Sequence, residues 1–414
     1  MKSISLSAFL LFFIFQAKTQ VITSYNLNVK IDVESKKLFV KGDIQIDFGN
    51  QDSIVLVLWK NSNIHSITKG KDKINFRFDT LSESPIMYIP NGRKLIVYKI
   101  SQGSNIQTFN FDYESSMKDV NGWARSFTED WIELNFYCAW FPLNQNSRNF
   151  TSKLDISIDK NYKVTGSGVI SRKKSSWEMN QSWGGFDNVI IASKNLKSRI
   201  YSKNKIYIET VYSDFSEANA DSVIAECQYA FDLYQELFGN KDSTYLKFII
   251  SPFEMGGGYS RKNFVSLRTK SFNLHTRGGV GHEIAHFWWS NAPTTTWEDW
   301  LNEAFAEYSM LIYFRERLSN DVFNQKIAEY KESARNSPPI WGIDRKAPEA
   351  YTALYEKGAL ILCDFESRVG KEKLFDFLKI LIQSKTKTTN DFLNLIEDKF
   401  SKETRYWFEN KLKT

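Results

Sequence analysis

Two histidines in the same helical face constrain this chain more than any other feature of its sequence. His282 and His286 stand four residues apart and enclose Glu283 in a largely apolar segment, and the chain has only 4 histidines among 414 residues. Residues with this spacing on an α-helix project from one face, one turn apart. Both imidazoles can therefore reach one metal ion. The spacing predicts a helix with two metal ligands and a carboxylate between them that can act on water.

A glutamate further along the chain, Glu303, is the predicted third ligand. It follows Trp300 in a second expected helix, which starts near Thr296 with Asp299 in a capping-box-like position. Two imidazoles and one carboxylate suit zinc and leave one coordination position open for water, as in catalytic rather than structural sites. The sequence thus predicts a zinc-dependent hydrolase with one Zn2+ per chain. Glu307 is interpreted either as a hydrogen-bond partner of a ligating imidazole or as a solvated surface carboxylate.

The composition is that of an ordinary globular protein. Hydrophobic residues make up 42% of the chain and charged residues 25%. The net charge of +6 is a small difference between 54 basic and 48 acidic residues, which are spread along the chain. No nucleic-acid partner is therefore expected. A length of 414 residues favours two domains preceded by a leader.

The N-terminal residues have the pattern of a signal peptide. Met1 and Lys2 precede an apolar run over residues 4–15, and we place the signal peptide at residues 1–20. The run is too short to span a bilayer comfortably, and a buried first strand is the alternative interpretation. The prediction is an exported protein, periplasmic, secreted or at the cell surface, with no stable membrane span after cleavage. Its oligomeric state is left open.

Two patterns divide the remaining chain into a strand-rich and a helix-rich part. Residues 21–200 show short runs of alternating apolar and polar residues, for example 25–31, separated by turn residues. Such alternation predicts a β-sandwich with one solvated face. Residues 201–414 begin with short strands and a long amphipathic helix at 216–237, and they continue as helices to the end.

Three consecutive glycines, Gly256, Gly257 and Gly258, lie between two expected strands ahead of the histidine pair. They are interpreted either as a flexible turn or as a strand edge whose backbone can approach a bound peptide closely. In the second interpretation, an extended peptide pairs with this edge and presents its backbone carbonyl to the metal.

These motifs together resemble those of the gluzincin aminopeptidases, the family of alanyl and leucyl aminopeptidases and leukotriene-hydrolysing enzymes. The histidine pair and residues 300–306 resemble the family's zinc signature, and residues 355–359 resemble its Tyr-Glu-Lys-Gly-Ala segment. The resemblance implies an α+β fold: an N-terminal β-sandwich over 21–200, then a thermolysin-like zinc metallopeptidase domain over 201–414 whose C-terminal half is mostly helical. It also implies that Tyr355 stabilises the transition state, whereas the residue alone would suggest a half-buried core tyrosine.

The chain departs from this family where the family recognises the amino end of its substrate. The family's Gly-x-Met-Glu-Asn segment is replaced here, and Tyr259 stands in place of an amine-binding glutamate. The resemblance implies that Glu133 is a second amine-binding residue, although a surface glutamate is the alternative. We therefore expect Glu133, Tyr259 and the three glycines to bind substrate. The connection from His286 to Glu303 is also shorter than the family's, and the chain stops where the family's catalytic domain ends, which predicts a more open cleft.

The most favoured function is a zinc-dependent aminopeptidase that releases N-terminal residues from peptides. Glu283 would take a proton from the attacking water and pass it to the leaving amine, while Tyr355 would donate to the oxyanion. If Glu133 does not anchor an amine, the same fold with an open cleft would be an endopeptidase. The other alternative is a non-catalytic peptide-binding module on a retired peptidase scaffold, although the expected ligands and base are all present.

Overall fold

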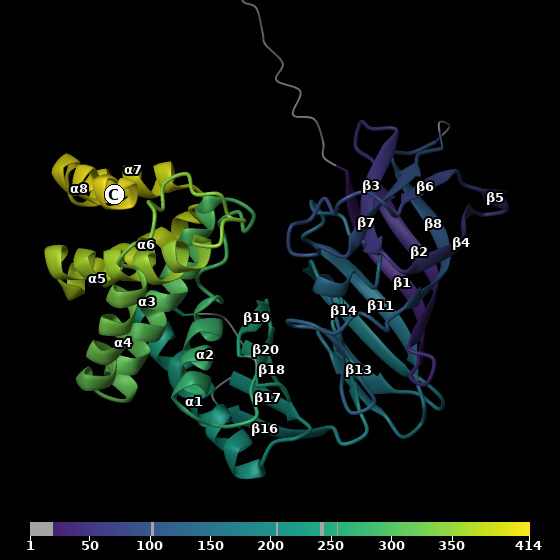
Figure 1. The fold of residues 1–414 in the computed structure, drawn as a ribbon, viewed down its shortest axis with the longest axis horizontal. Coiled ribbons are helices and arrows are strands. Elements are labelled where there is room, and N and C mark those ends of the chain that lie inside the picture. The colour runs from purple at the N-terminus through teal and green to yellow at the C-terminus, as the bar shows by residue number, and fades with distance from the viewer. Residues whose placement is uncertain (1–19, 101–102, 204–205, 241–243, 255) are drawn as a thin grey trace, which may run out of the picture.

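The computed structural model describes residues 20–100, 103–203, 206–240, 244–254 and 256–414. The expected signal peptide at residues 1–20 lies outside these ranges apart from Gln20. The strand-rich and helix-rich parts lie side by side, and the sheet of the helix-rich part lies between its helices and the first part (Figure 1). Within the described ranges, no helix is both long enough and apolar enough to cross a membrane.

The strand-rich part is built from antiparallel β-sheets. Its strands are β1 (Val21–Asp32), β2 (Lys37–Asp47), β3 (Ser53–Trp59), β4 (Ser62–Lys69), β5 (Asp72–Lys73), β6 (Phe76–Asp79), β7 (Gly92–Tyr98), β8 (Ile106–Ser116), β9 (Ser126–Phe127), β10 (Ile132–Leu134), β11 (Phe150–Ser157), β12 (Lys163–Gly166), β13 (Val169–Arg172), β14 (Trp177–Gly185) and β15 (Ile190–Ser193). The largest sheet has the order β13-β14-β11-β1-β2-β8-β4-β5, in which only β1 and β11 run parallel. The other sheets are β12-β15-β10-β9 and β3-β7-β6.

Alternating burial explains why these residues form sheets rather than helices. Along β1, every second side chain from Tyr25 to Ile31 is buried, and β2 and β8 show the same alternation. The buried side chains of the sheets, such as Leu27, Ile44 and Phe109, form one hydrophobic core. The alternation in the sequence therefore predicted the sheet-rich domain correctly.

The helix-rich part begins with a mixed sheet. Its strands are β16 (Lys197–Lys203), β17 (Ile206–Tyr212), β18 (Thr244–Ser251), β19 (Gly258–Arg261) and β20 (Phe264–Arg268). The order is β16-β17-β18-β20-β19, with parallel strands in the centre and antiparallel strands at both edges. The expected domain boundary at residue 200 falls inside β16, because this strand pairs with β17 in the second sheet.

Helices cover one side of this sheet and form the rest of the chain (Figure 1). They are α1 (Glu217–Phe238), α2 (Leu274–Ala285), α3 (Trp300–Arg317), α4 (Asn320–Ser333), α5 (Gly358–Val369), α6 (Lys371–Ser384), α7 (Thr389–Lys399) and α8 (Lys402–Lys413), with the 3-10 turns η1 (Phe136–Cys138) and η2 (Trp297–Asp299) and the π-helical turn η3 (Thr352–Lys357). Their buried faces share one core with the sheet. The α+β fold with a mostly helical C-terminal half, expected from the resemblance, is confirmed.

The two parts contact each other through buried side chains. Trp131 and Ile191 of the sandwich form a small core with Ile249, Tyr259 and Phe264 of the mixed sheet. A buried cation reinforces this contact, since the Lys247 ammonium group on β18 donates to the Thr165 hydroxyl at 3.1 Å and to backbone carbonyls of the sandwich. The sandwich therefore packs against the face of the mixed sheet opposite the helices, because Ile249 faces the sandwich whereas Phe248 and Ile250 belong to the core shared with the helices.

Candidate zinc centre

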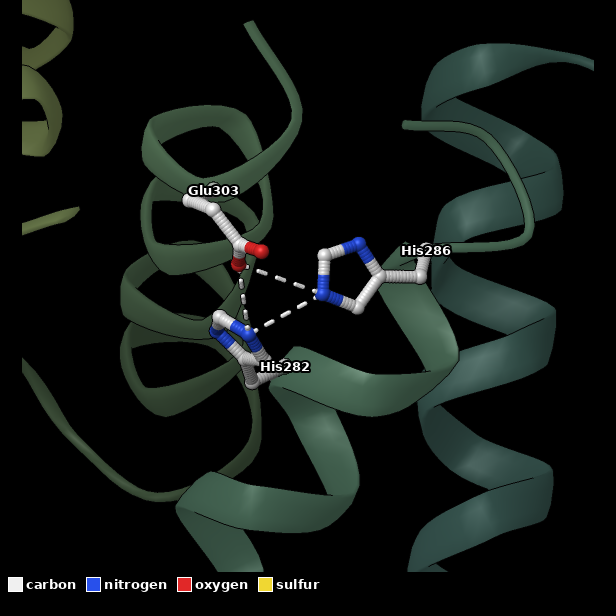
Figure 2. A group of neighbouring side chains, drawn as sticks. All are labelled: His282, His286 and Glu303. Atoms are coloured by element: carbon white, nitrogen blue, oxygen red, sulfur yellow. Dashed lines mark hydrogen bonds and ion pairs between the residues drawn. The ribbon is translucent and has the colours of Figure 1, made fainter. Parts of the chain in front are cut away.

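The three predicted metal ligands meet at one point between α2 and α3 (Figure 2). The Nε2 atoms of His282 and His286 lie 3.1 Å apart, and each lies 3.4 Å from Oε2 of Glu303. Glu303 Oε2 is buried without a hydrogen-bond partner in the described part of the chain. Two imidazole nitrogens and one carboxylate oxygen directed at a common point are the donor set that Zn2+ prefers. These residues fit a single zinc ion.

The ends of two helices place these side chains. Helix α2 starts at an Asn273 cap, whose side chain accepts from the Thr276 backbone N–H at 3.0 Å. His282 lies in its last turn and His286 at its C-cap, so the spacing of one turn is kept. Glu303 lies in the first turn of α3. The helical placement of the histidine pair therefore follows the sequence prediction.

Oxygen atoms lie next to the outer ring nitrogens of both imidazoles. The Nδ1 atom of His286 lies 2.9 Å from the carbonyl oxygen of Trp289, which can only accept, so Nδ1 carries the proton. Its Nε2 is therefore free to bind a metal. The Nδ1 atom of His282 lies 3.1 Å from Oε1 of Glu307. Glu307 is only 6% exposed and also accepts from the Tyr330 hydroxyl, so its interpretation as a surface carboxylate is wrong.

The charges at this site are strongly perturbed by their surroundings. Burial raises the pKa of Glu283 above its ordinary value, while the nearby imidazoles of His282 and His286 oppose this rise. Burial alone would raise the pKa of Glu303 too, but the neighbouring imidazoles hold it well below its ordinary value. Glu283 Oε2 is buried, and none of the described residues hydrogen-bonds to it. Glu283 is thus a carboxylate with an unused acceptor atom beside the ligands.

The predicted tyrosine, Tyr355, also lies at this site. It belongs to the π-helical turn η3, an unusual geometry that often marks functional positions. Its ring is parallel to the imidazole of His282, with an interplanar angle of 6° and centroids 6.0 Å apart. The following helix approaches α3 closely, since a β-carbon added at Gly358 would lie 2.5 Å from the β-carbon of Ala304. Glycine at 358 therefore allows Tyr355 to lie this near the ligands.

The three glycines lead into a strand edge beside Glu283. Gly256 and Gly257 have φ angles of 64° and 81°, which favour glycine, and Gly258 begins the edge strand β19. A β-carbon at Gly258 would lie 2.8 Å from Oε1 of Glu283. One at Gly257 would lie 2.8 Å from Nε1 of Trp123. The strand-edge interpretation therefore describes Gly258, whereas Gly256 and Gly257 form the turn before it. The close approach of the Ser266 carbonyl oxygen, 2.7 Å from such a β-carbon, and of Glu283 explains glycine at 258.

Glu133 lies beneath this edge and does not line the cavity. It is 1% exposed, and its Oε1 accepts from the hydroxyls of Tyr259 at 2.8 Å and Ser266 at 2.9 Å. Its Oε2 accepts from Trp131 Nε1 at 3.1 Å and from the Ser251 hydroxyl. Both oxygens are thus occupied within the protein. The structure does not bring the Glu133 carboxylate to a position where it meets a substrate, in contrast to the sequence-based expectation, because Tyr259 covers it.

A large cavity joins these features. Its volume is about 1430 Å³, and its walls come from both parts of the chain. The candidate ligands, Glu283, Gly257, Gly258, Tyr259 and Tyr355 line it from the helix-rich part, and Trp123 and Tyr137 line it from the sandwich. A cavity of this size accommodates a peptide of several residues.

Sequence reasoning missed several charged residues in the walls of this cavity. Arg261 forms an ion pair of 2.8 Å with Asp187 and lies over the ring of Tyr259, 4.6 Å from its centroid. Arg345 contacts Asp299 and Tyr355. Neither arginine belongs to a local motif, and each pairs with an acidic residue far away in the sequence, Arg261 with Asp187 and Arg345 with Asp299. The signal in the sequence was position alone: Arg261 lies close to Tyr259, and Arg345 lies close to Tyr355.

The start of α3 also differs from the prediction. Thr296 precedes the 3-10 turn η2, and its side chain forms no capping hydrogen bond. The Asp299 carboxylate instead accepts from Asn302 Nδ2 at 2.9 Å and from Arg345 Nε at 2.9 Å. The capping-box prediction is wrong because a tight turn replaces the helical first turn and a distant arginine recruits the carboxylate.

Comparisons with known proteins agree with this architecture. Residues 266–410 match the model of the peptidase family M1 domain. Over 116 residues, 24% of this chain, the sequence is 34% identical to Tricorn protease-interacting factor F2 of Thermoplasma volcanium, and the match spans 14% of that protein's length. A crystallised M1 zinc metallopeptidase from Deinococcus radiodurans is similar with a TM-score of 0.71 and 14% identity, over 95% of this chain and 94% of that chain. Leukotriene A4 hydrolase from Saccharomyces cerevisiae is similar with a TM-score of 0.72 and 15% identity, over 95% of this chain and 68% of that chain.

The matched segment contains both helices that carry the candidate ligands, and the two-domain fold extends over nearly the whole chain. Residues 266–410 therefore resemble an M1 peptidase domain, and the whole chain has the fold of a two-domain M1 zinc metallopeptidase. The match supports a hydrolase, as the zinc signature and the Tyr-Glu-Lys-Gly-Ala segment within residues 266–410 indicated.

Proposed function

We propose that this chain is a zinc-dependent aminopeptidase that binds one Zn2+ through His282, His286 and Glu303. The observation that carries the proposal is the convergence of these three side chains with Glu283 and Tyr355 in one cavity. When bound, zinc polarises the scissile carbonyl and makes water more acidic.

Glu283 is proposed to act as the general base and then as the general acid. Its unused Oε2 can take a proton from the attacking water and later give it to the leaving amine. Burial raises the pKa of this carboxyl, which brings it closer to the pH at which the enzyme works. A carboxylate with a raised pKa is the stronger proton acceptor for this step.

Tyr355 and the β19 edge are proposed to hold the reacting group. The Tyr355 hydroxyl can donate to the oxyanion that develops on the scissile carbonyl. An extended peptide paired with the edge strand at Gly258 would pass directly beside Glu283, because a missing β-carbon leaves the space. Both interactions fix the carbonyl next to the base.

Release of N-terminal residues is supported by relatives. A two-domain M1 zinc metallopeptidase of similar fold binds L-tryptophan, and the Deinococcus radiodurans enzyme binds Tyr-Ser-Ala as a substrate. Both are mutants in which one glutamate is replaced by alanine, and the ligands are an amino acid and a tripeptide. We assign the same substrate class, short peptides, to this chain.

A specific observation favours endopeptidase activity as the second candidate. An aminopeptidase needs negative charge beside the substrate's ammonium group, yet the Glu133 carboxylate is covered by Tyr259. The cation of Arg261 lies over the same tyrosine ring. A site of this kind accepts a peptide whose amino end continues beyond the cavity.

Mass-spectrometric analysis of a mixed peptide library separates these candidates. The library contains each peptide with a free and with an acetylated amino end, and the controls are a chelator and the Glu283→Gln variant. Chelator-sensitive loss of single residues from free ends alone supports the aminopeptidase. Internal cuts that are insensitive to acetylation overturn it in favour of the endopeptidase.

We also propose that the protein is exported, because residues 1–20 have the pattern of a signal peptide. N-terminal sequencing of the protein recovered outside the cytoplasm tests this. A mature chain starting near residue 20 supports export, and an intact Met1 in cytoplasmic protein overturns it.

A further inference from the structure

An arginine outside all the recognised motifs contacts the proposed oxyanion donor. Arg345 lies between α4 and η3 in the cavity wall, and its side chain is 12% exposed. Its Nη2 donates to the hydroxyl oxygen of Tyr355 at 3.2 Å, and its Nε donates to Oδ2 of Asp299 at 2.9 Å. The guanidinium also lies over the ring of Tyr355, 5.7 Å from its centroid. Arg345 therefore bridges the tyrosine and the start of the helix that carries Glu303.

The chemistry of this hydrogen bond fixes the direction of the tyrosine proton. A guanidinium has donors and no acceptor, so the phenolic oxygen must accept from Arg345. The Tyr355 hydroxyl hydrogen therefore takes no part in this hydrogen bond. In the described part of the chain, no residue accepts a hydrogen bond from this hydroxyl. The hydrogen is therefore available to a carbonyl oxygen in the cavity.

A network of buried groups holds the arginine itself. Asp299 is buried and accepts from Arg345 and from Asn302 Nδ2. The Asn302 side chain in turn accepts from the backbone N–H of Ala292 at 3.0 Å and donates to its carbonyl at 3.1 Å. Since Asn302 precedes Glu303, the position of the guanidinium is tied to that of the metal ligand.

The cation has an electrostatic effect as well as a geometric one. A positive charge beside the phenolic oxygen stabilises the negative charge that grows there when the hydrogen is shared with an oxyanion. Burial raises the pKa of Tyr355, as do Glu303 and Asp299, whereas Arg345 lowers it. Without the arginine, the phenol would be a poorer donor in the same place.

We propose that Arg345 is a positioning residue for the reaction: it directs the hydroxyl hydrogen of Tyr355 toward the scissile carbonyl and strengthens it as a donor in the transition state. This inference rests on the proposed function, because it assigns Arg345 a role through Tyr355. It requires that the effect of Arg345 disappears when the tyrosine hydroxyl is absent.

A double-mutant cycle tests this requirement. Arg345→Met, Tyr355→Phe and the double variant are compared for kcat, KM and zinc content with one peptide substrate. We expect Arg345→Met to lower kcat about tenfold, the effect typical of one charge-assisted hydrogen bond, with KM changed less than about twofold and zinc retained. In the Tyr355→Phe background the same replacement should cause no further loss. A further tenfold loss in that background overturns the proposal, because Arg345 would then act independently of the hydroxyl.

Two further variants keep the test decisive. If Arg345→Met does not fold, Arg345→Lys takes its place in the cycle. The lysine retains the charge but cannot reach both partners, so it should show a smaller kcat loss that also depends on the Tyr355 hydroxyl. Arg335→Met is the matched control, since this exposed arginine on the neighbouring segment pairs with exposed Glu332. It should leave kcat unchanged. An equal kcat loss in Arg335→Met would overturn the assignment.

A binding measurement separates failure of this inference from failure of the proposed function. A phosphonate peptide analogue, a tetrahedral anion, is titrated calorimetrically into the zinc-loaded protein and its variants. Arg345→Met should weaken binding about tenfold, and only when Tyr355 is present. If the wild-type protein hydrolyses no peptide, the proposed function fails while this titration still decides the role of Arg345. Equal weakening with and without the tyrosine hydroxyl overturns the inference alone.

Discussion

Replacing Glu133 with alanine should destabilise the protein rather than only weaken substrate binding. The carboxylate accepts four hydrogen bonds, from Trp131, Ser251, Tyr259 and Ser266. Each buried donor left without a partner costs roughly 1 kcal/mol, so Glu133→Ala should lower the free energy of unfolding by about 4 kcal/mol. Three of the donors belong to the mixed sheet, whereas Glu133 belongs to the sandwich, and the loss therefore includes the contact between the two parts.

Urea unfolding followed by tryptophan fluorescence measures this loss. Glu133→Gln is the matched variant, because its amide keeps one acceptor oxygen and its nitrogen can donate to hydroxyls that reorient. It should cost only about 1 to 2 kcal/mol. The reasoning is refuted if Glu133→Ala changes the free energy of unfolding by less than about 1 kcal/mol while KM for free-amino peptides rises more than about tenfold. That result would show that the carboxylate anchors the substrate.

The remaining predictions concern the reaction centre. Glu283→Gln should keep its zinc, as metal analysis would show, and lose at least about a hundredfold in kcat because an amide cannot accept the proton; retained hydrolysis would contradict the base role. Tyr355→Phe should lower kcat by roughly a hundredfold with zinc retained, and an unchanged kcat would exclude the hydroxyl from the reaction. Gly258→Ala should lower kcat on the order of tenfold to a hundredfold, because the new methyl group would lie 2.8 Å from Glu283 Oε1; wild-type kinetics would show that the edge has room. Removing zinc with a chelator should lower the thermal midpoint, and adding zinc should restore it, since a ligand of the folded state stabilises that state. A midpoint that does not respond to zinc would speak against the site.

The ligand positions could be predicted because local geometry determines them. The spacing of His282 and His286 places both imidazoles on one helical face, whatever surrounds the helix. Glu303 could be predicted as a ligand because residues 300–306 indicated a second helix, which packs against the first. The alternation of apolar and polar residues along β1 likewise predicted a half-buried strand, because successive side chains of a strand point to opposite faces of the sheet.

The surroundings of these residues could not be predicted in the same way. Glu133 matches a motif position, but its burial depends on hydroxyls from three strands of another part of the chain. Arg345 lies in an irregular segment, and only the folded chain brings it to Tyr355 and Asp299. The pattern at Thr296 predicted a cap, whereas the tertiary partner of Asp299 decided its geometry. Such contacts are long-range and leave no period in the sequence.

The close approach of Gly358 to Ala304 has a consequence for how this site could change. Ala304 directly follows a metal ligand, and Gly358 follows Tyr355 by less than one helical turn. The distance between the proposed ligand and the tyrosine is therefore limited by the packing of Gly358 against the methyl group of Ala304, and it depends on both helices. Transfer of the tyrosine segment to another zinc-binding scaffold would therefore require a small residue at the position of Ala304 on the opposite helix, because Gly358 and Ala304 pack directly against each other.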